Sequence, residues 1–217
     1  MEERRSFLKK SGLVILGLAT VGLGQSKKNA MAATTAKVAM IIDLNRCLGC
    51  QSCVIACKQH NQTTSGFFNT RIELREKGTF PTARMSFTPK LCNQCEQAPC
   101  VRACSTGATF QLANGIVVTD WVQCIGDGAC VTACPYNARF LDPESENKAD
   151  KCDFCIGRLE KGLEPACVDA CPAHARIFGD LNNPQGDFAT YLQQKKLSPP
   201  DKDIDTGTRV FYTVSDK

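Results

Sequence analysis

Large aromatic side chains and long apolar runs are both scarce in this chain of 217 residues. One tryptophan and three tyrosines accompany 11 phenylalanines, so few large side chains are available to fill a core. The longest apolar run, over residues 13–23, is about half the roughly 20 residues that a membrane-spanning helix needs. Neither a glycine-rich phosphate loop nor a nucleophile–base arrangement is present. These absences give no support for a multi-spanning membrane protein, for nucleotide binding or for hydrolytic catalysis.

An excess of positive charge is missing everywhere except at the N-terminus. The formal net charge is +4, but residues 1–32 hold six Lys and Arg residues against two acidic ones, which leaves 20 of each sign in the remainder. A domain with balanced charge lacks the basic surface that attracts nucleic acid. We therefore expect no nucleic-acid partner.

The basic N-terminus has the organisation of an export leader. Arg4 and Arg5 begin the run Arg-Arg-Ser-Phe-Leu-Lys, which resembles the twin-arginine signal, and the short apolar run follows it. Ala30-Met31-Ala32 provides a small-x-small cleavage site, so residues 1–32 are expected to be removed and the mature chain to start at or near Ala33. An uncleaved anchor helix is the alternative. The twin-arginine route exports folded, cofactor-loaded proteins, which predicts a location in the periplasm or on the extracytoplasmic face of the cytoplasmic membrane.

Cysteine is the residue present in excess, with 15 copies in four groups. Group one is Cys47, Cys50, Cys53 and Cys57; group two is Cys92, Cys95, Cys100 and Cys104; group three is Cys124, Cys130 and Cys134; group four is Cys152, Cys155, Cys167 and Cys171. The first group has the C-x2-C-x2-C-x3-C spacing of bacterial ferredoxins, in which three thiolates hold one iron–sulfur cluster and the fourth ligates its neighbour. The spacing predicts paired iron–sulfur clusters.

Two other uses of cysteine compete with this interpretation. Zinc sites also use C-x2-C pairs, but they need about four ligands each and normally lack runs of three cysteines. Exported proteins commonly form disulfides, although an odd number of cysteines cannot all pair and export after folding lets clusters capture the thiolates first. Iron–sulfur binding remains the favoured prediction.

The segment after the last cysteine of each group repeats. Cys104, Cys134 and Cys171 each start a seven-residue segment with Ala at the fifth position and an apolar residue at the seventh. Pro directly follows the cysteine in two of the three segments. The segment from Phe110 to Thr119 contains Asn114-Gly115 and predicts a β-hairpin, and the apolar run within residues 37–44 predicts a strand that leads to Cys47. The expected fold is therefore α+β: tandem ferredoxin-like repeats with short strands, short helices and long loops.

With these motifs assembled, the chain resembles the four-cluster electron-transfer subunits of the dimethyl-sulfoxide-reductase superfamily, in particular those of tetrathionate and polysulfide reductases and of the formate-dependent nitrite reductase system. The residues that carry the resemblance are Ile41 to Cys47, Leu91 to Cys95 with Ala98-Pro99-Cys100, Gly115 to Val118, Cys134-Pro135-Tyr136, Asp150 to Cys155 and Leu163 to Cys167.

The resemblance implies a cluster assignment and a domain layout. The implied ligand sets are Cys47, Cys50, Cys53 and Cys171; Cys92, Cys95, Cys100 and Cys134; Cys124, Cys130 and Cys104; and Cys152, Cys155, Cys167 and Cys57. One half would comprise residues 33–90 and 141–181, the other residues 91–140, and residues 182–217 would form a polar C-terminal tail on the surface or on a partner.

The third of these sets lacks a thiolate. Residue 127, where the family usually has cysteine, is Asp127. Its carboxylate is a candidate fourth ligand that would hold one iron only weakly, because a carboxylate is a poorer iron ligand in such a cluster than a thiolate. Three [4Fe–4S] clusters are therefore expected, with a [3Fe–4S] or labile [4Fe–4S] cluster at this position. The alternative is that Asp127 faces solvent in a turn between Gly126 and Gly128.

By the same resemblance, the protein is expected to perform no bond chemistry. It would relay electrons between a molybdopterin catalytic subunit and a membrane-embedded, quinone-reactive anchor subunit. A free-standing exported polyferredoxin and a zinc-stabilised interaction module are the alternatives. Because clusters would replace much of the apolar core, the metal-free chain is expected to be largely unfolded.

Overall fold

The computed structural model describes residues 36–214, which form short helices and strands of the predicted α+β class. The expected leader, with Arg4, Arg5 and the expected new N-terminus at Ala33, lies outside these residues. Within residues 36–214, no helix has both the length and the apolar character needed to cross a bilayer.

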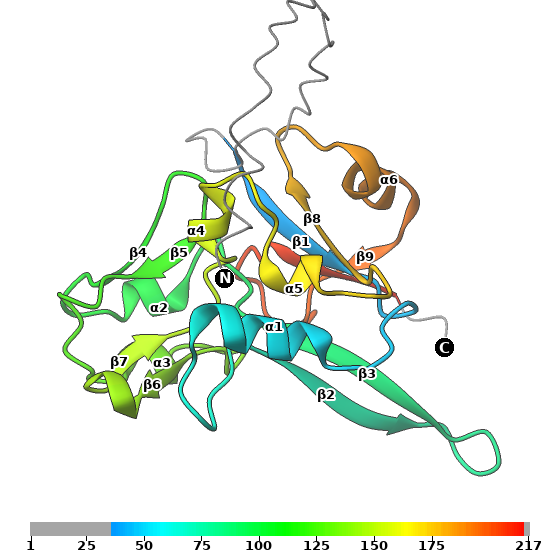
Figure 1. Ribbon diagram of the computed structural model, residues 1–217, viewed down its shortest axis with the longest axis horizontal. Helices are drawn as coiled ribbons and strands as arrows, with labels where there is room; N and C mark the ends of the chain where they lie inside the picture. Colours follow the sequence, from blue (N-terminus) through cyan, green and yellow to red (C-terminus); the bar gives the residue numbers. More distant parts are fainter. Residues whose placement is uncertain (1–35, 215–217) are drawn as a thin grey trace, which may run out of the picture.

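The main sheet joins the two ends of the described chain (Figure 1). Its strand order is β8-β1-β10-β9, with bounds Arg176–Asp180, Val38–Ile42, Val210–Thr213 and Leu197–Ser198. β1 pairs antiparallel with β8 and parallel with β10. The strand expected within residues 37–44 is thus confirmed, and all five of its residues are buried. A continuous apolar run is typical of a strand that is covered on both faces.

The two faces of β1 have different neighbours. Ala39 and Ile41 pack with Phe188 of α6, the helix Gly186–Gln194. The other three residues of β1 lie in the same apolar cluster as Cys53 and Cys167. β1 therefore anchors the cysteine-rich interior to a conventional apolar layer on the other side of the sheet.

The C-terminal segment differs from the expected surface tail. β10 lies inside the main sheet, and α6 covers one face of that sheet (Figure 1). Asp43, which follows β1, accepts hydrogen bonds from the Tyr191 hydroxyl at 2.7 Å and from the Thr213 hydroxyl at 3.1 Å. Burial would raise the pKa of Asp43, but these hydrogen bonds, with the Tyr191 bond the strongest of them, hold it below its ordinary value. Residues 182–214 therefore belong to the folded body.

Three hairpins complete the strands. The predicted hairpin of residues 110–119 is confirmed as β4 (Thr109–Gln111) and β5 (Val117–Thr119), and β6 (Phe140–Asp142) pairs with β7 (Lys148–Asp150). A longer hairpin that the sequence did not predict, β2 (Thr70–Lys77) and β3 (Arg84–Leu91), projects from the body (Figure 1). The β6–β7 hairpin packs through Ala149 with Ala108 and Val117, so residues 141–150 join the group two and three side of the molecule rather than the half expected from sequence.

Short helices carry or adjoin the cysteines. They are α1 (Ser52–Asn61) and the single turns α2 (Pro99–Arg102), α3 (Ala129–Thr132), α4 (Ile156–Leu159) and α5 (Ala166–Asp169), with a 3-10 turn at Pro143–Ser145. α1 packs against α5, and α2 packs against α3. Group one thus meets group four, and group two meets group three.

Candidate metal centres

All 15 cysteines are free, and those of the first implied set line one cavity. Cys47, Cys50 and Cys53 come from the loop and first turn around α1, and Cys171 arrives from the end of α5 more than a hundred residues later. We call these four residues site I. The cavity that they line holds about 330 Å³ of empty space, counting the part open to solvent.

A second cavity, of about 320 Å³ on the same measure, is lined by Cys92, Cys95, Cys100 and Cys134, which we call site II. The first three surround the start of α2, and Cys134 follows α3. Thr206, from the C-terminal segment, donates a hydrogen bond to the Cys95 sulfur at 3.1 Å. No signal in the sequence indicated this contact, because Thr206 lies in a polar stretch without a motif.

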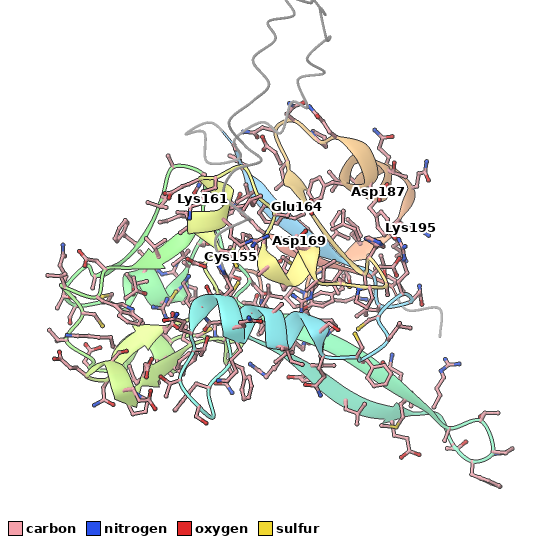
Figure 2. All side chains as sticks on the ribbon, in the orientation of Figure 1. Cys155, Lys161, Glu164, Asp169, Asp187 and Lys195 are labelled. Atoms are coloured by element: carbon pink, nitrogen blue, oxygen red, sulfur yellow. The ribbon has the colours of Figure 1, made fainter. Side chains whose placement is uncertain are left out.

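The four cysteines of site IV, Cys57, Cys152, Cys155 and Cys167, are all buried. The pKa of Cys152 is raised well above its ordinary value, mainly by burial and then by the neighbouring sulfurs of Cys57, Cys167 and Cys155. These four thiols therefore gather in one place in the interior, although three different segments supply them. Figure 2 labels one of them, Cys155, near the middle of the molecule and directly before α4.

Site III, comprising Cys104, Cys124 and Cys130, lies beside Asp127 on the group two and three side. The Cys104 sulfur accepts the Thr109 N–H at 3.3 Å. Cys124 and Cys130 are buried members of the apolar cluster that also contains Val117 and Ala149, and Cys104 packs against this cluster. The exposed Asp127 carboxylate accepts the Ser105 hydroxyl at 3.2 Å and the Ala129 N–H at 3.1 Å. Because Ser105 directly follows Cys104, these bonds hold Asp127 next to site III.

The loop of group one shows why glycine is needed between ligands. Gly49 lies between Cys47 and Cys50 with a φ of 68°, in the left-handed region that favours glycine. A Cβ atom on Gly49 would come within 2.3 Å of the Phe87 ring of β3. Glycine therefore permits both the turn and the close approach of the β2–β3 hairpin to site I.

Burial raises the pKa of seven of the cysteine thiols. It raises the pKa of Cys57 to about 12, and the pKa values of Cys95 and Cys155 to about 11. At neutral pH these thiols would keep their protons in a metal-free fold. Metal binding requires thiolates, so loading of these sites releases protons.

The surroundings of site II test whether an anionic metal cluster fits. Arg139 lines this cavity with only 4% of its surface exposed, yet its Nε and Nη1 make no hydrogen bond in the described structure. A buried cation with unsatisfied donors requires negative charge nearby. Thiolate-ligated iron–sulfur clusters provide that charge, and their cysteine ligands are already grouped. The residues present therefore fit such clusters. Among residues 36–214, no three His, Cys, Asp or Glu side chains are arranged to hold a single metal ion.

Three cationic residues that lie within a few positions of cysteine ligands in the sequence make local hydrogen bonds or ion pairs. Lys58 donates to the backbone oxygens of Thr63, Thr64 and Phe67, and Arg158 pairs with Asp169 at 2.7 Å. The buried Lys151 instead donates to the backbone oxygens of Val117 and Cys152, between sites II and IV.

Comparison with known proteins gives both family models and relatives. A 4Fe-4S dicluster domain matches residues 83–181, and a 4Fe-4S binding domain matches residues 44–63. The chain is 41% identical to a tetrathionate reductase subunit of Salmonella typhimurium, over 96% of this chain and 87% of the relative. It is 40% identical to the thiosulfate reductase electron transfer subunit PhsB of Salmonella typhi, over 76% and 89% respectively. Identity to the protein NrfC of Escherichia coli is 37%, over 88% and 86%.

Proposed function

Because this chain belongs to the family of iron–sulfur, non-catalytic electron-transfer subunits of respiratory reductases in the dimethyl-sulfoxide-reductase superfamily, we propose that it relays electrons from one partner subunit to another. One partner would be a molybdopterin catalytic subunit and the other a membrane-embedded, quinone-reactive anchor. Each of the four sites would hold one cluster, and a bound cluster accepts and passes on one electron at a time. Sites I, II and IV would hold [4Fe–4S] clusters, and site III a [3Fe–4S] or labile [4Fe–4S] cluster.

The observation that carries this proposal is the contact of the four sites in a continuous series. Sites I and IV adjoin through the packing of α1 on α5, and sites II and III adjoin through α2 and α3. Gln94, between two ligands of site II, is fully buried and donates to the Cys152 oxygen of site IV at 2.7 Å. The series I–IV–II–III therefore has protein contacts at every step.

The two ends of this series differ from its middle. At site I, Cys50 is exposed, and the nearby Leu48 and Ile55 are each 65% exposed. At site III, Val122 and Ile125 are 93% and 65% exposed. Exposed apolar side chains beside terminal electron carriers favour docking of partners at both ends. Site IV, in the middle of the series, has only buried cysteines.

Gentle detergent extraction from anaerobically grown cells tests this assignment. The chain is expected to co-purify, brown and iron-containing, with a large molybdenum-containing subunit and a membrane subunit. Leu48→Glu should release one partner and Val122→Glu the other, since a charge in an apolar contact opposes docking. Both side chains are exposed, so each change should alter the free energy of unfolding by less than about 0.5 kcal/mol.

Phe80→Glu is the matched control, because Phe80 is 94% exposed at the turn of the β2–β3 hairpin, away from the loops of both terminal sites. It should leave the complex intact. A monodisperse iron-loaded monomer from wild-type cells would instead support a free-standing polyferredoxin. A colourless protein with zinc and no iron would rule out the cluster assignment.

The proposed location is the extracytoplasmic face of the cytoplasmic membrane, reached by the twin-arginine route. The support is the Arg4-Arg5 motif and the short apolar run after it. N-terminal sequencing of the mature protein is expected to begin at or near Ala33. Replacing both arginines by Lys should leave an uncleaved precursor in the cytoplasm, as the pair and not the charge is the signal. A mature protein that retains Arg4 and Arg5 would contradict cleavage.

A further inference from the structure

Two buried arginines occupy the same place in the repeated segments. Arg139 is the fifth residue after Cys134, and Arg176 is the fifth residue after Cys171. The third copy of the segment has Thr109 at this position. Arg176 is the first residue of β8, and Arg139 directly precedes β6. The strand that follows Cys171 or Cys134 therefore fixes the backbone position of each arginine.

Arg176 lies between sites I and IV. Its side chain lines the cavity of site I, and its Nη1 donates to the Cys167 sulfur of site IV at 3.5 Å. Its Nη2 donates to the Thr70 hydroxyl at 2.9 Å, which fixes the plane of the guanidinium. Burial would lower the pKa of Arg176, but the sulfurs of Cys167 and then Cys53 raise it above its ordinary value.

Arg139 has the matching position between sites II and III. It lines the cavity of site II, and its Nη2 donates to the hydroxyls of Thr109 and Thr119 at 3.0 and 2.7 Å. Thr109, which accepts the first of these bonds, also donates its backbone N–H to the Cys104 sulfur of site III at 3.3 Å, so Arg139 is one residue away from that site. Burial would lower the pKa of Arg139, whereas the sulfurs of Cys100, in site II, and Cys130, in site III, raise it. As with Arg176, threonine hydroxyls orient the guanidinium and cysteine sulfurs are its negative neighbours.

Neither arginine has a carboxylate to balance its charge. Arg176 and Arg139 are 3% and 4% exposed, and within residues 36–214 neither forms an ion pair with Asp or Glu. The similarly buried Arg209 does pair with Glu96, at 3.3 Å. An uncompensated charge in the interior is strongly unfavourable, so these two positions require another anion. The sites on either side of each arginine supply it when they are loaded.

We propose that Arg176 is a shared counter-charge for the clusters of sites I and IV, and Arg139 for those of sites II and III. This inference rests on the proposed function, because it assumes that clusters occupy the sites. Reduction adds one negative charge to a cluster, and a fixed cation nearby favours the reduced state. Each arginine therefore raises the midpoint potentials of two neighbouring clusters together and keeps that pair matched for transfer.

Redox titration of the purified complex, followed by EPR, tests the proposal in Arg176→Gln and Arg139→Gln. Each variant should lower the midpoint potentials of two of the four clusters and leave the other two unchanged, and the two variants should affect different pairs. Arg176→Lys and Arg139→Lys keep the charge and should stay close to wild type. Arg102→Gln is the control, since Arg102 is exposed and two residues from Cys100, where solvent screens its charge.

The results separate the inference from the function on which it rests. If wild-type protein lacks four cluster signals, the proposed function fails. If the wild type shows four cluster signals but the midpoint potentials do not change in the Gln variants, the shared counter-charge is overturned. An equal change of all four potentials would overturn it as well. If the Gln variants do not assemble clusters, the Lys variants decide. Assembly with Lys supports a need for charge, whereas failure with Lys as well shows that the arginine shape is required and overturns the proposal.

Discussion

Removal of iron from the purified protein is expected to unfold residues 91–150 completely. The buried cluster on this side of the molecule has eight members, of which four are cysteines and three are alanines, so Val117 is its one larger aliphatic side chain. Such a core buries little apolar surface once the metal is gone. Binding of a structural metal to thiolates contributes on the order of 10–16 kcal/mol in zinc peptides, as much as the whole stability of a typical domain at about 5–15 kcal/mol.

The single tryptophan and hydrogen exchange provide the measurements. Trp121 donates its indole N–H to the Ala149 oxygen at 3.1 Å and so reports on this side of the molecule. Trp121 is already 41% exposed, so chelation of iron should shift its emission only slightly to longer wavelength. The larger expected change is a loss of hydrogen-exchange protection from β4 to β7. Exchange should be less affected in β1, whose Ala39 and Ile41 pack on α6 without any cysteine. Reconstitution with iron and sulfide should reverse both changes. A metal-free protein with native near-UV circular dichroism and cooperative unfolding would refute the expectation.

Replacement of Asp127 by Cys is expected to abolish the EPR signal of an oxidised [3Fe–4S] cluster. A carboxylate holds iron in such a cluster more weakly than a thiolate, so site III of the wild type should keep three irons from Cys104, Cys124 and Cys130 and lose the fourth on mild oxidation. Oxidised [3Fe–4S] clusters are paramagnetic and oxidised [4Fe–4S] clusters are silent. Iron should rise from about 15 to about 16 atoms per chain in the Asp127→Cys variant.

Asp127→Asn is the matched control. The two bonds use different carboxylate oxygens. In the Asn variant the amide oxygen can still accept the Ala129 N–H while the amide NH2 donates to the Ser105 hydroxyl oxygen, so the loop should keep its conformation. Without a thiolate the EPR signal should remain. A signal that persists in Asp127→Cys would mean that the missing ligand is misassigned. A wild-type protein with about 16 irons and no signal, even after ferricyanide, would exclude the three-iron cluster.

Local signals in the sequence were sufficient for some elements and absent for others. The Asn114-Gly115 turn predicted the β4–β5 hairpin correctly because its geometry depends on neighbouring residues, and the Asn114 side chain accepts the Ile116 N–H at 3.0 Å. β10 has four residues, follows a polar stretch and pairs with β1 across the whole chain, so no local pattern could indicate it. The β2–β3 hairpin was missed because its outer residues are exposed and its strands carry many charges.

The candidate sites show the same division. Spacing alone grouped the cysteines, and the pairing of group one with four and of group two with three came from the family resemblance. The proposed counter-charges could not be predicted from the sequence. Arg139 and Arg176 stand at the same position of the repeated segments, but no sequence pattern indicates that both are buried and that neither pairs with a carboxylate. The Thr206 bond to Cys95 depends on tertiary structure alone.

The parallel pairing of β1 with β10 sets an order of events during synthesis. Thr213 bonds to Asp43 across 170 residues, and at about 5–20 residues per second the ribosome needs roughly 10–35 s to make that stretch. During this interval one edge of β1, which lies shortly after the proposed leader, has no partner strand. A nascent or truncated chain that ends before residue 210 lacks β10 and cannot complete the main sheet. The main sheet can therefore close only after residues 210–213 have been synthesised.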